Sequence, residues 1–369
     1  MLTRFYPGKN TFVTRNERNA MLCPIPAPCA ASRTAAEARQ QRLTKPPGSL
    51  GRLERLAVDI AGWQATPHPA VRPSQVLIFA ADHPIALAGV SPYPQAVTTA
   101  MVDTFLRGGA ASSVMAGRLG VPMKVVDVGI AAGESRTARA PGDAAFERAG
   151  VADADEGDIR TEDAMAPAVF AAALAAGREA VAALPGDTRS VILGEMGIGN
   201  STLAAAVTSS LCGLAPELVT GPGTGSTGDC LARKIDAVRR SRDRSATSPP
   251  LEILRRAGGR EMAAIVGAAA AALSRRMVVV ADGFISSAAI ATLVAAEPAA
   301  RAGLIFSHVG GEPGHRLLLE WLRAAPVLAL GMALGEGSGG LAALPLLDLA
   351  CVIHTSMQTF AEAGVPNRD

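Results

Sequence analysis

The chain has 369 residues, of which 49% are hydrophobic and 18% are charged, and its formal net charge is +2. This length allows one large domain or two unequal ones with a sizeable core. Because basic residues are scattered and only 4% of residues are aromatic, we expect no nucleic-acid-binding surface. The chain has no run of about 18 bulky apolar residues, so we expect no membrane span and a soluble protein.

The cysteines and the N-terminal segment bear on the compartment. The five cysteines are Cys23, Cys29, Cys212, Cys230 and Cys351. They form no Cys-x-x-Cys pair and have no histidine at ligand spacing, which indicates reduced thiols in the cytoplasm and no structural zinc. Residues 1–33 contain no continuous apolar stretch, so we expect a poorly ordered extension and no secretory signal.

Helical segments are expected at both ends of the chain. Residues 35–43 are typical of a helix, and a second, amphipathic helix is indicated by Leu53, Leu56, Ala57, Ile60 and Trp63. We assign residues 34–70 and a C-terminal helix in residues 347–369 to a small helical lobe. Residues 71–346 are expected to form a large α/β domain that contains the active site.

Within this large domain, short apolar runs alternate with helical segments. The runs are residues 76–80, 123–128, 190–193, 277–281, 303–306 and 327–330. A helix is expected around Val97–Leu119. The alternation implies right-handed βαβ units and a mainly parallel, Rossmann-like sheet of about five to seven strands flanked by helices. Ala131–Asp163 is expected to be a surface excursion, and Arg239–Pro250 a charged loop.

Polar residues follow several of these runs. They are Asp82, Glu195, Asp282, His308 and Glu336. Since the carboxyl ends of parallel strands share one edge of a sheet, we expect these side chains to gather there, where open α/β proteins place their chemistry. Both glutamates lie in glycine-rich loops, and this repetition indicates an enzyme.

The first glutamate loop has the composition of an anion-binding turn. It contains Gly194, Gly197, Gly199, Asn200, Ser201 and Thr202. The glycines surround the turn, and the last three residues begin a helix whose free amides and dipole attract a phosphate. An ordinary strand-to-helix turn with an N-cap explains the same residues. Neither the Walker pattern nor Gly-x-Gly-x-x-Gly is present. Gly221–Gly225 could form a second wall.

The second loop places Glu336 between Gly335 and Gly337. Flanking glycines cost backbone entropy and add no packing, so a structural role explains this glutamate poorly. The apolar helix that follows would partly bury the carboxylate. Burial raises a carboxyl pKa toward neutrality, where the group works best as a general base.

Other polar segments have simpler interpretations. Asp82-His83 could be an acid–base or metal site, but without a histidine partner at ligand spacing we favour a turn. The basic cluster between Arg233 and Arg244 is typical of a solvated helix face, apart from Lys234. No Gly-x-Ser-x-Gly elbow or reactive-cysteine context is present, so we expect no covalent nucleophile.

Six motifs occur together in the order of one family. They are Lys45–Glu54, Phe79–His83, Gly89–Thr98, Gly194–Thr202, Asp282–Phe284 and Leu334–Gly339. Over residues 35–366 the chain resembles the nicotinate-nucleotide–dimethylbenzimidazole phosphoribosyltransferases, which make the lower-ligand nucleotide of cobalamin. The resemblance implies transfer of 5-phosphoribosyl from nicotinate mononucleotide to 5,6-dimethylbenzimidazole, with inversion at C1′. The products would be α-ribazole 5′-phosphate and nicotinate.

The resemblance also implies residue roles. Glu336 matches the general base that takes the benzimidazole N–H proton, and Glu195 matches a second active-site carboxylate. Base-binding positions are Ser91, Tyr93, Gln95 and Asp82. Phosphoribosyl-binding positions are Gly194, Gly197, Gly199, Asn200, Ser201, Thr202, Gly223, Gly225, Lys234, Asp282 and His308. The family pattern implies a homodimer with no cofactor and no required metal. Pro84, Pro222 and Gly310 depart from residues common in the family.

Alternatives remain open at this point. The enzyme could use another lower-ligand base, such as a different benzimidazole, a purine or a phenol. The chain could instead be a non-catalytic nucleotide- or base-binding protein of the same fold. A Rossmann dehydrogenase is disfavoured because Gly-x-Gly-x-x-Gly is absent after the first apolar run.

Overall fold

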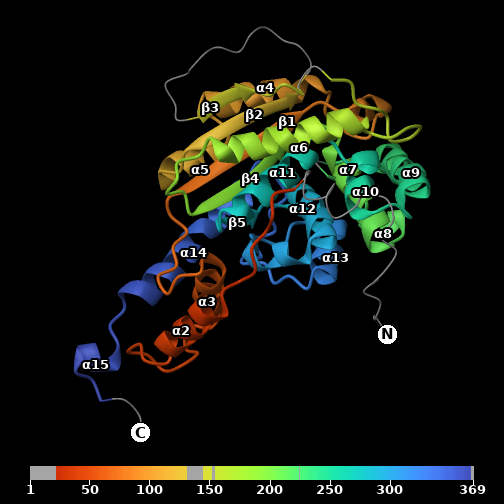
Figure 1. Ribbon diagram of the computed structural model, residues 1–369. Coiled ribbons are helices and arrows are strands. Elements are labelled where there is room, and N and C mark those ends of the chain that lie inside the picture. Colours follow the sequence, from red (N-terminus) through yellow and green to blue (C-terminus); the bar gives the residue numbers. More distant parts are fainter. Residues whose placement is uncertain (1–21, 131–143, 152–153, 224, 367–369) are drawn as a thin grey trace.

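The structure is a computed structural model that describes residues 22–130, 144–151, 154–223 and 225–366 (Figure 1). Its centre is a six-stranded sheet in the order β3-β2-β1-β4-β5-β6, in which every strand pair is parallel. The strands are β1 Ser74–Ala81, β2 Met123–Gly129, β3 Ala144–Arg148, β4 Ser190–Met196, β5 Val278–Ala281 and β6 Leu304–Phe306. The parallel α/β fold and the strand number expected from the sequence are confirmed.

The strand order reverses between β1 and β4. From β1 the chain builds the sheet one way to β2 and β3, and from β4 it builds the other way to β5 and β6. Phe79 on β1 pairs with Glu195 on β4, so the first glutamate lies at this reversal. Open α/β sheets leave a ligand-binding crevice at such a switch point, because neighbouring crossovers depart in opposite directions.

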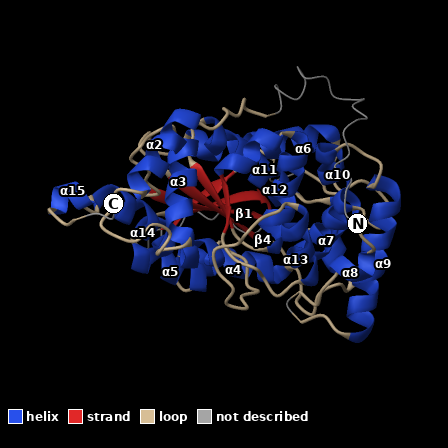
Figure 2. Cartoon of the chain, turned by 90° about the horizontal axis from the view of Figure 1, so that it is seen from below, coloured by secondary structure: helices blue, strands red, loops and turns tan. Residues whose placement is uncertain are grey.

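Helices cover both faces of the sheet. In chain order they are α2 Ala30–Gln40, α3 Arg52–Gln64, η1 Pro84–Ala88, α4 Ala96–Leu106, α5 Ala111–Leu119, α6 Pro167–Ala182, α7 Asn200–Cys212, α8 Pro216–Val219, α9 Gly228–Ser245, α10 Pro250–Ala257, α11 Arg260–Ser274, α12 Phe284–Ala296, η2 Pro298–Gly303, α13 Pro313–Trp321, α14 Ser338–Ser356 and α15 Phe360–Ala363. Figure 2 shows α6, α11 and α12 on one side of the sheet and α4, α5 and α14 on the other.

Small residues set how closely the two longest helices of one face approach. A Cβ on Gly177 of α6 would lie 1.9 Å from the carbonyl oxygen of Ala264 on α11, and a Cβ on Gly267 of α11 would lie 2.0 Å from that of Leu174 on α6. Only glycine permits this contact. In α11 every residue from Arg260 to Leu273 is buried, so this alanine-rich helix forms the core of the layer and fixes the position of its own first turn.

The small helical lobe expected from both ends of the chain is confirmed (Figure 1). Arg39 of α2 donates to the carbonyl oxygen of His354 at 2.6 Å, and Gln40 hydrogen-bonds to His354 Nδ1 at 2.9 Å. Leu43 forms an isolated bridge with Thr359. Helix α14 is continuous from Ser338 to Ser356, so residue 347 lies inside a helix shared by the large domain and the lobe.

The N-terminal boundary also differs from the expected one. Helix α2 begins at Ala30, and Leu22, the first described residue, belongs to the hydrophobic core. The last part of the predicted extension over residues 1–33 is therefore packed at residue 22 and helical from residue 30. Its first 21 residues lie outside the described part of the chain.

Two segments that were expected to be irregular form regular elements. Ala144–Arg148, inside the predicted surface excursion, forms β3 at the edge of the sheet. Arg239–Ser245, inside the predicted charged loop, forms the last turns of α9. Neither element shows a buried apolar pattern in the sequence: no residue of β3 is buried, and the last turns of α9 present Arg239 and Arg240 to solvent.

Two other predictions are also corrected. Residues 327–330 form only a bridge between Leu328 and His308 within the described chain, not a strand of the sheet. The helix expected over residues 97–119 divides into α4 and α5, because Gly108 adopts a positive φ of 74° between them.

Helix α14 is long and apolar enough, by its 19 residues and mean hydropathy of 1.4, to cross a membrane. More than half of it is buried within the protein, 56% of the window that passes this test. The core helix of a soluble protein has the same properties, so this single helix is weak evidence for a membrane span.

Candidate active site

The two glutamate loops lie against each other at the carboxyl edge of the sheet. A Cβ on Gly194 would lie 2.5 Å from the amide nitrogen of Gly337 and 2.7 Å from the carbonyl carbon of Glu336. A Cβ on Gly335 would lie 2.5 Å from Oε1 of Glu195. Glycine at both positions therefore lets the second loop rest directly on the end of β4. Two loops that are far apart in the sequence thus form one surface.

Glu336 has an unusual backbone conformation. Its φ is 62°, and both flanking glycines also have positive φ, 89° at Gly335 and 77° at Gly337. The left-handed region costs a non-glycine residue about 1–2 kcal/mol, so the surrounding contacts must hold the turn. The turn directs the carboxylate inward: Glu336 is only 5% exposed, and Ser112 of α5 donates to its Oε2 at 3.4 Å. Burial raises the pKa of Glu336.

Asp282, after β5, holds this turn in place. Its carboxylate accepts hydrogen bonds from the amides of Gly337 at 3.0 Å, Gly339 at 2.6 Å and Gly340 at 3.1 Å. These amides lie at the start of α14, where the helix has no preceding turn whose carbonyl oxygens could accept their hydrogen bonds. Burial raises the pKa of Asp282 to about 7, although the three amides lower it. Asp282 thus acts on the position of Glu336 through the backbone.

Glu195 shares the site but has a different hydrogen-bond partner. Asn200 donates to its Oε2, so this side chain is engaged within the turn. Burial, followed by the nearby charges of Asp282 and Glu261, raises the pKa of Glu195 to about 8. At neutral pH this carboxyl group therefore carries a proton for most of the time. Burial raises the pKa of both glutamates, so each holds a proton more readily than an exposed carboxylate.

A buried lysine and a hydroxyl converge beside the turn. A Cβ on Gly223 would lie 2.9 Å from both Nζ of Lys234 and Oγ of Ser201. Lys234 is 1% exposed, donates to the carbonyl oxygen of Gly221 at 2.9 Å, and has its pKa lowered by burial. Glu312 accepts from the Gly223 amide at 2.8 Å. A lysine, a hydroxyl and a glycine-rich backbone are the components of a phosphate-binding cradle, and in this structure the Glu312 carboxylate occupies the Gly223 amide of that cradle.

The residues of the turn divide by the direction of their side chains. Gly199, with φ 95°, precedes α7, and a Cβ there would lie 3.1 Å from Ile85. Ser201 points toward Gly223, and Asn200 toward Glu195. Thr202 is fully buried beneath them. The structure thus brings Asn200 and Ser201 to the site, whereas Thr202 supports the helix from inside. At Gly225 a Cβ would meet no other described residue within 4 Å.

The loop of Ser91, Tyr93 and Gln95 borders the same cradle. Ser226 donates to the carbonyl oxygen of Val90 at 3.0 Å, which ties this loop to the 221–226 segment. Ser91 Oγ accepts from the amide of Tyr93 at 3.1 Å. Gln95 immediately precedes α4, and Tyr93 is 48% exposed. Tyr93 thus lies partly exposed on a loop that is tied to the 221–226 segment.

His308 lies behind the Glu336 turn. A Cβ on Gly339 would lie 2.0 Å from its Nδ1, and Oγ of Ser307 is 3.0 Å from the same nitrogen. His315 packs edge-on at 5.9 Å between ring centroids. Burial lowers the pKa of His308, and burial together with the nearness of His308 lowers the pKa of His315 to about 3. Both rings are therefore neutral at physiological pH.

Sequence reasoning missed a cluster of buried charges below the turn. His83 lies between the carboxylates of Glu156 and Glu261, and the carbonyl oxygen of Asp82 beside it accepts from Arg260 at 3.3 Å. Glu156 comes from an irregular segment and Glu261 from the first turn of α11. The sequence signals were Asp82-His83, for which we favoured a turn, and Gly258-Gly259 directly before the helix that carries Glu261.

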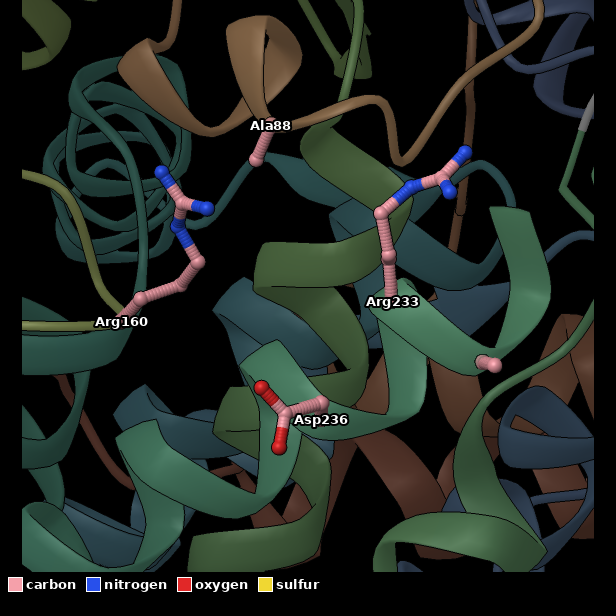
Figure 3. Close-up of a pocket in the computed structure, with 5 residues that line it drawn as sticks. Ala88, Arg160, Arg233 and Asp236 are labelled. Carbon is pink, nitrogen blue, oxygen red and sulfur yellow. The ribbon is translucent and has the colours of Figure 1, made fainter. Parts of the chain in front are cut away.

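Two surface hollows lie away from these residues. One of about 290 Å³ is lined by Ala88, Arg160, Ala232, Arg233 and Asp236 (Figure 3). The other, about 440 Å³, lies beside α3, β5 and β6. Neither is lined by Glu195 or Glu336. Among the described residues, no three His, Cys, Asp or Glu side chains group as metal ligands.

The fold and the sheet edge define a parallel α/β protein in which buried carboxyl groups lie beside a buried lysine and glycine-rich loops. Comparisons with known proteins then give the family. Residues 25–365 match the family model described as phosphoribosyltransferase. The chain therefore belongs to the phosphoribosyltransferase family and is a pentosyltransferase.

Individual relatives and a solved structure narrow the family to one kind of phosphoribosyltransferase. The nicotinate-nucleotide–dimethylbenzimidazole phosphoribosyltransferase of Xanthomonas oryzae pv. oryzae is 45% identical over 345 residues, 93% of this chain and 97% of the relative. That of Sinorhizobium fredii is 43% identical over 351 residues, 95% and 96%. A crystal structure of the Thermus thermophilus enzyme of this name matches with a TM-score of 0.83 at 38% identity, covering 92% of this chain and 100% of that one. The resemblance seen in the motifs is confirmed.

Proposed function

We propose that this enzyme transfers 5-phosphoribosyl from nicotinate mononucleotide to 5,6-dimethylbenzimidazole and releases α-ribazole 5′-phosphate and nicotinate. The observation that carries the proposal is the buried, left-handed Glu336 in contact with the Gly194 loop. The names of the relatives give the substrates. The reaction needs a proton acceptor close to the bound phosphate, and this contact places the Glu336 carboxylate close to the Gly194 loop.

The mechanism follows from these groups. Lys234, Ser201 and the amides of the adjacent turns hold the phosphate. The benzimidazole enters past Ser91, Tyr93 and Gln95, and its neutral nitrogen attacks C1′ as nicotinate leaves from the opposite face, so that C1′ is inverted. The pyridinium is already a good leaving group, so the enzyme supplies mainly position and a proton acceptor.

The two carboxyl groups divide the proton chemistry in this proposal. Glu336 takes the N–H proton of the benzimidazole, helped by the raised pKa that burial gives it. Glu195, neutral at pH 7, donates a hydrogen bond within the site. Asp282 and His308 support the Glu336 turn. We further propose a homodimer that works in the cytoplasm without a required metal or cofactor.

The decisive variant is Glu336→Gln, which keeps the size of the side chain and removes the base. We expect turnover to fall roughly 10²–10⁴-fold, as for the loss of one general base, with the fold retained by circular dichroism. Nicotinate release from the mononucleotide is measured with dimethylbenzimidazole, other benzimidazoles, a purine and a phenol in parallel.

The outcomes separate the alternatives. Faster release with another base would assign a different lower ligand to the same site. If the wild-type protein releases no nicotinate with any base, the enzyme proposal is wrong, and a binding protein of the same fold remains.

A further inference from the structure

A buried triad of charged side chains lies under the turn that follows Glu195. His83 is fully buried; its Nδ1 is 2.7 Å from Oε2 of Glu156, and its Nε2 is 3.3 Å from Oε2 of Glu261. The three residues come from the end of β1, the segment before α6 and the first turn of α11. Although burial lowers it, the charges of Glu261 and Glu156 raise the pKa of His83 to about 10. The ring is therefore an imidazolium.

The triad touches the site through glycine. A Cβ on Gly197, two residues after Glu195, would lie 2.6 Å from Nε2 of His83 and 2.6 Å from the carbonyl oxygen of Ala81. A Cβ on Gly259 would lie 2.5 Å from Oε2 of Glu261. Both glycines allow the backbone to close directly onto the charged groups. The turn after Glu195 therefore packs directly against the imidazolium ring of His83.

The triad also sets the charge around Glu195. Glu261 forms an ion pair with His83, but neither of its carboxylate oxygens accepts a hydrogen bond of good geometry from the described residues. Its charge acts on Glu195 directly. The compensating positive charges are His83, the N-terminus of α11 and Arg260, whose amide donates to Glu156 Oε1 at 3.2 Å.

Other charged groups face the same region from neighbouring elements. Asp82 follows β1 beside His83, and Asp282 and Glu336 act on Glu195 from β5 and the α14 turn. Neutralising Glu261 therefore removes one of three negative charges that act on Glu195, without touching the substrate-binding residues proposed above.

We propose that Glu156, His83 and Glu261 form a positioning device for Glu195: the ion pairs of His83 with both glutamates hold its ring against Gly197 and so fix the turn that follows Glu195. None of the three is among the residues proposed above to contact the substrate. The inference rests on the proposed function for its kinetic readout, and it adds residues that the transfer mechanism does not use.

The test compares Glu261→Gln, His83→Gln and their double variant with Asp236→Asn, a control that removes an exposed carboxylate on α9. Removing the Glu261 charge lowers the pKa of Glu195, so Glu195 loses its proton at lower pH. We expect the alkaline limb of the kcat profile to move down by about one pH unit. Asp236→Asn leaves the limb in place.

His83→Gln leaves two buried carboxylates without their cation and loosens the turn, so we expect kcat to fall roughly 10²-fold. The double variant removes one of those carboxylates, and we expect it to be more active than His83→Gln alone. Thermal unfolding of each variant shows whether the fold is kept. If His83→Gln does not fold, the pH profile of Glu261→Gln alone decides.

An NMR measurement separates failure of this inference from failure of the proposed function. Ring ¹⁵N shifts of wild-type His83 are expected to stay those of an imidazolium at pH 8. An imidazole at pH 8, or an alkaline limb in Glu261→Gln that matches the control, would overturn the triad whatever the substrate. A protein that releases no nicotinate yet keeps the imidazolium would overturn only the proposed function.

Discussion

Replacing Gly194 by alanine is a direct test of the contact between the two glutamate loops. The new Cβ would lie 2.5 Å from the Gly337 amide nitrogen, whereas few real Cβ atoms come closer than 3.4 Å. The difference, 3.4 − 2.5, means that the Glu336 turn must retreat by about 0.9 Å. A displacement near 1 Å costs roughly 10²-fold in rate, and overpacking costs about 1–3 kcal/mol of stability.

The assay is kcat for nicotinate release, with the free energy of unfolding measured by denaturant. Gly186→Ala is the matched control, because a Cβ there meets nothing within 4 Å in the described chain and its φ is not positive. We expect the control to keep wild-type kcat. If Gly194→Ala also keeps both kcat and stability, the loops do not rest on each other and the reasoning is wrong.

Two further predictions concern charge. Lys234→Ala is expected to raise KM for the nucleotide about 10- to 100-fold, as for the loss of one charge-assisted hydrogen bond, with a smaller effect on KM for the base. The control is Arg240→Ala, on the exposed face of the same helix. Equal KM values for the nucleotide in both variants would contradict a phosphate contact by Lys234. The folded-state pKa values of His83, about 10, and Glu195, about 8, are both raised, so at these two groups the native state holds more protons than the unfolded state. Their stabilising contribution is complete below the unfolded pKa values and is lost as pH rises toward 8 and 10. The lowered pKa values of His308 and His315 act in the opposite direction only up to the ordinary histidine value of 6.5. Denaturant unfolding across pH 7 to 10 should therefore show the fall, and a rise would refute it.

Much of the fold was readable because buried parallel strands are continuous apolar runs. Residues 76–80 and 190–193 are buried throughout and form the two central strands. Ala144–Arg148 was not readable, since none of the residues of this edge strand is buried and its sequence contains no continuous apolar run like those of the central strands. Residues 327–330 show the opposite limit: an apolar run can support a single bridge and no strand.

The site was readable in part for a similar reason. Glu195 and Asp282 could be placed at one edge because each lies at the carboxyl end of a parallel strand. Glu336 lies at the same edge although the run before it forms no strand, because its turn packs against Gly194. Asp282 was also placed at that edge, but its use as an acceptor for the Glu336 turn depends on backbone geometry that sequence does not carry. Glu156 and Glu261 could not be paired with His83, since no periodicity links an irregular segment to the start of a helix.

Helix α14 begins at the Glu336 turn and ends among the helices of the small lobe. Its 19 residues span about 28 Å at the usual rise. Because one continuous helix joins the lobe to the Glu336 turn, a substitution in the lobe that tilts α14 is expected to displace the Glu336 carboxylate without altering any residue of the two glutamate loops.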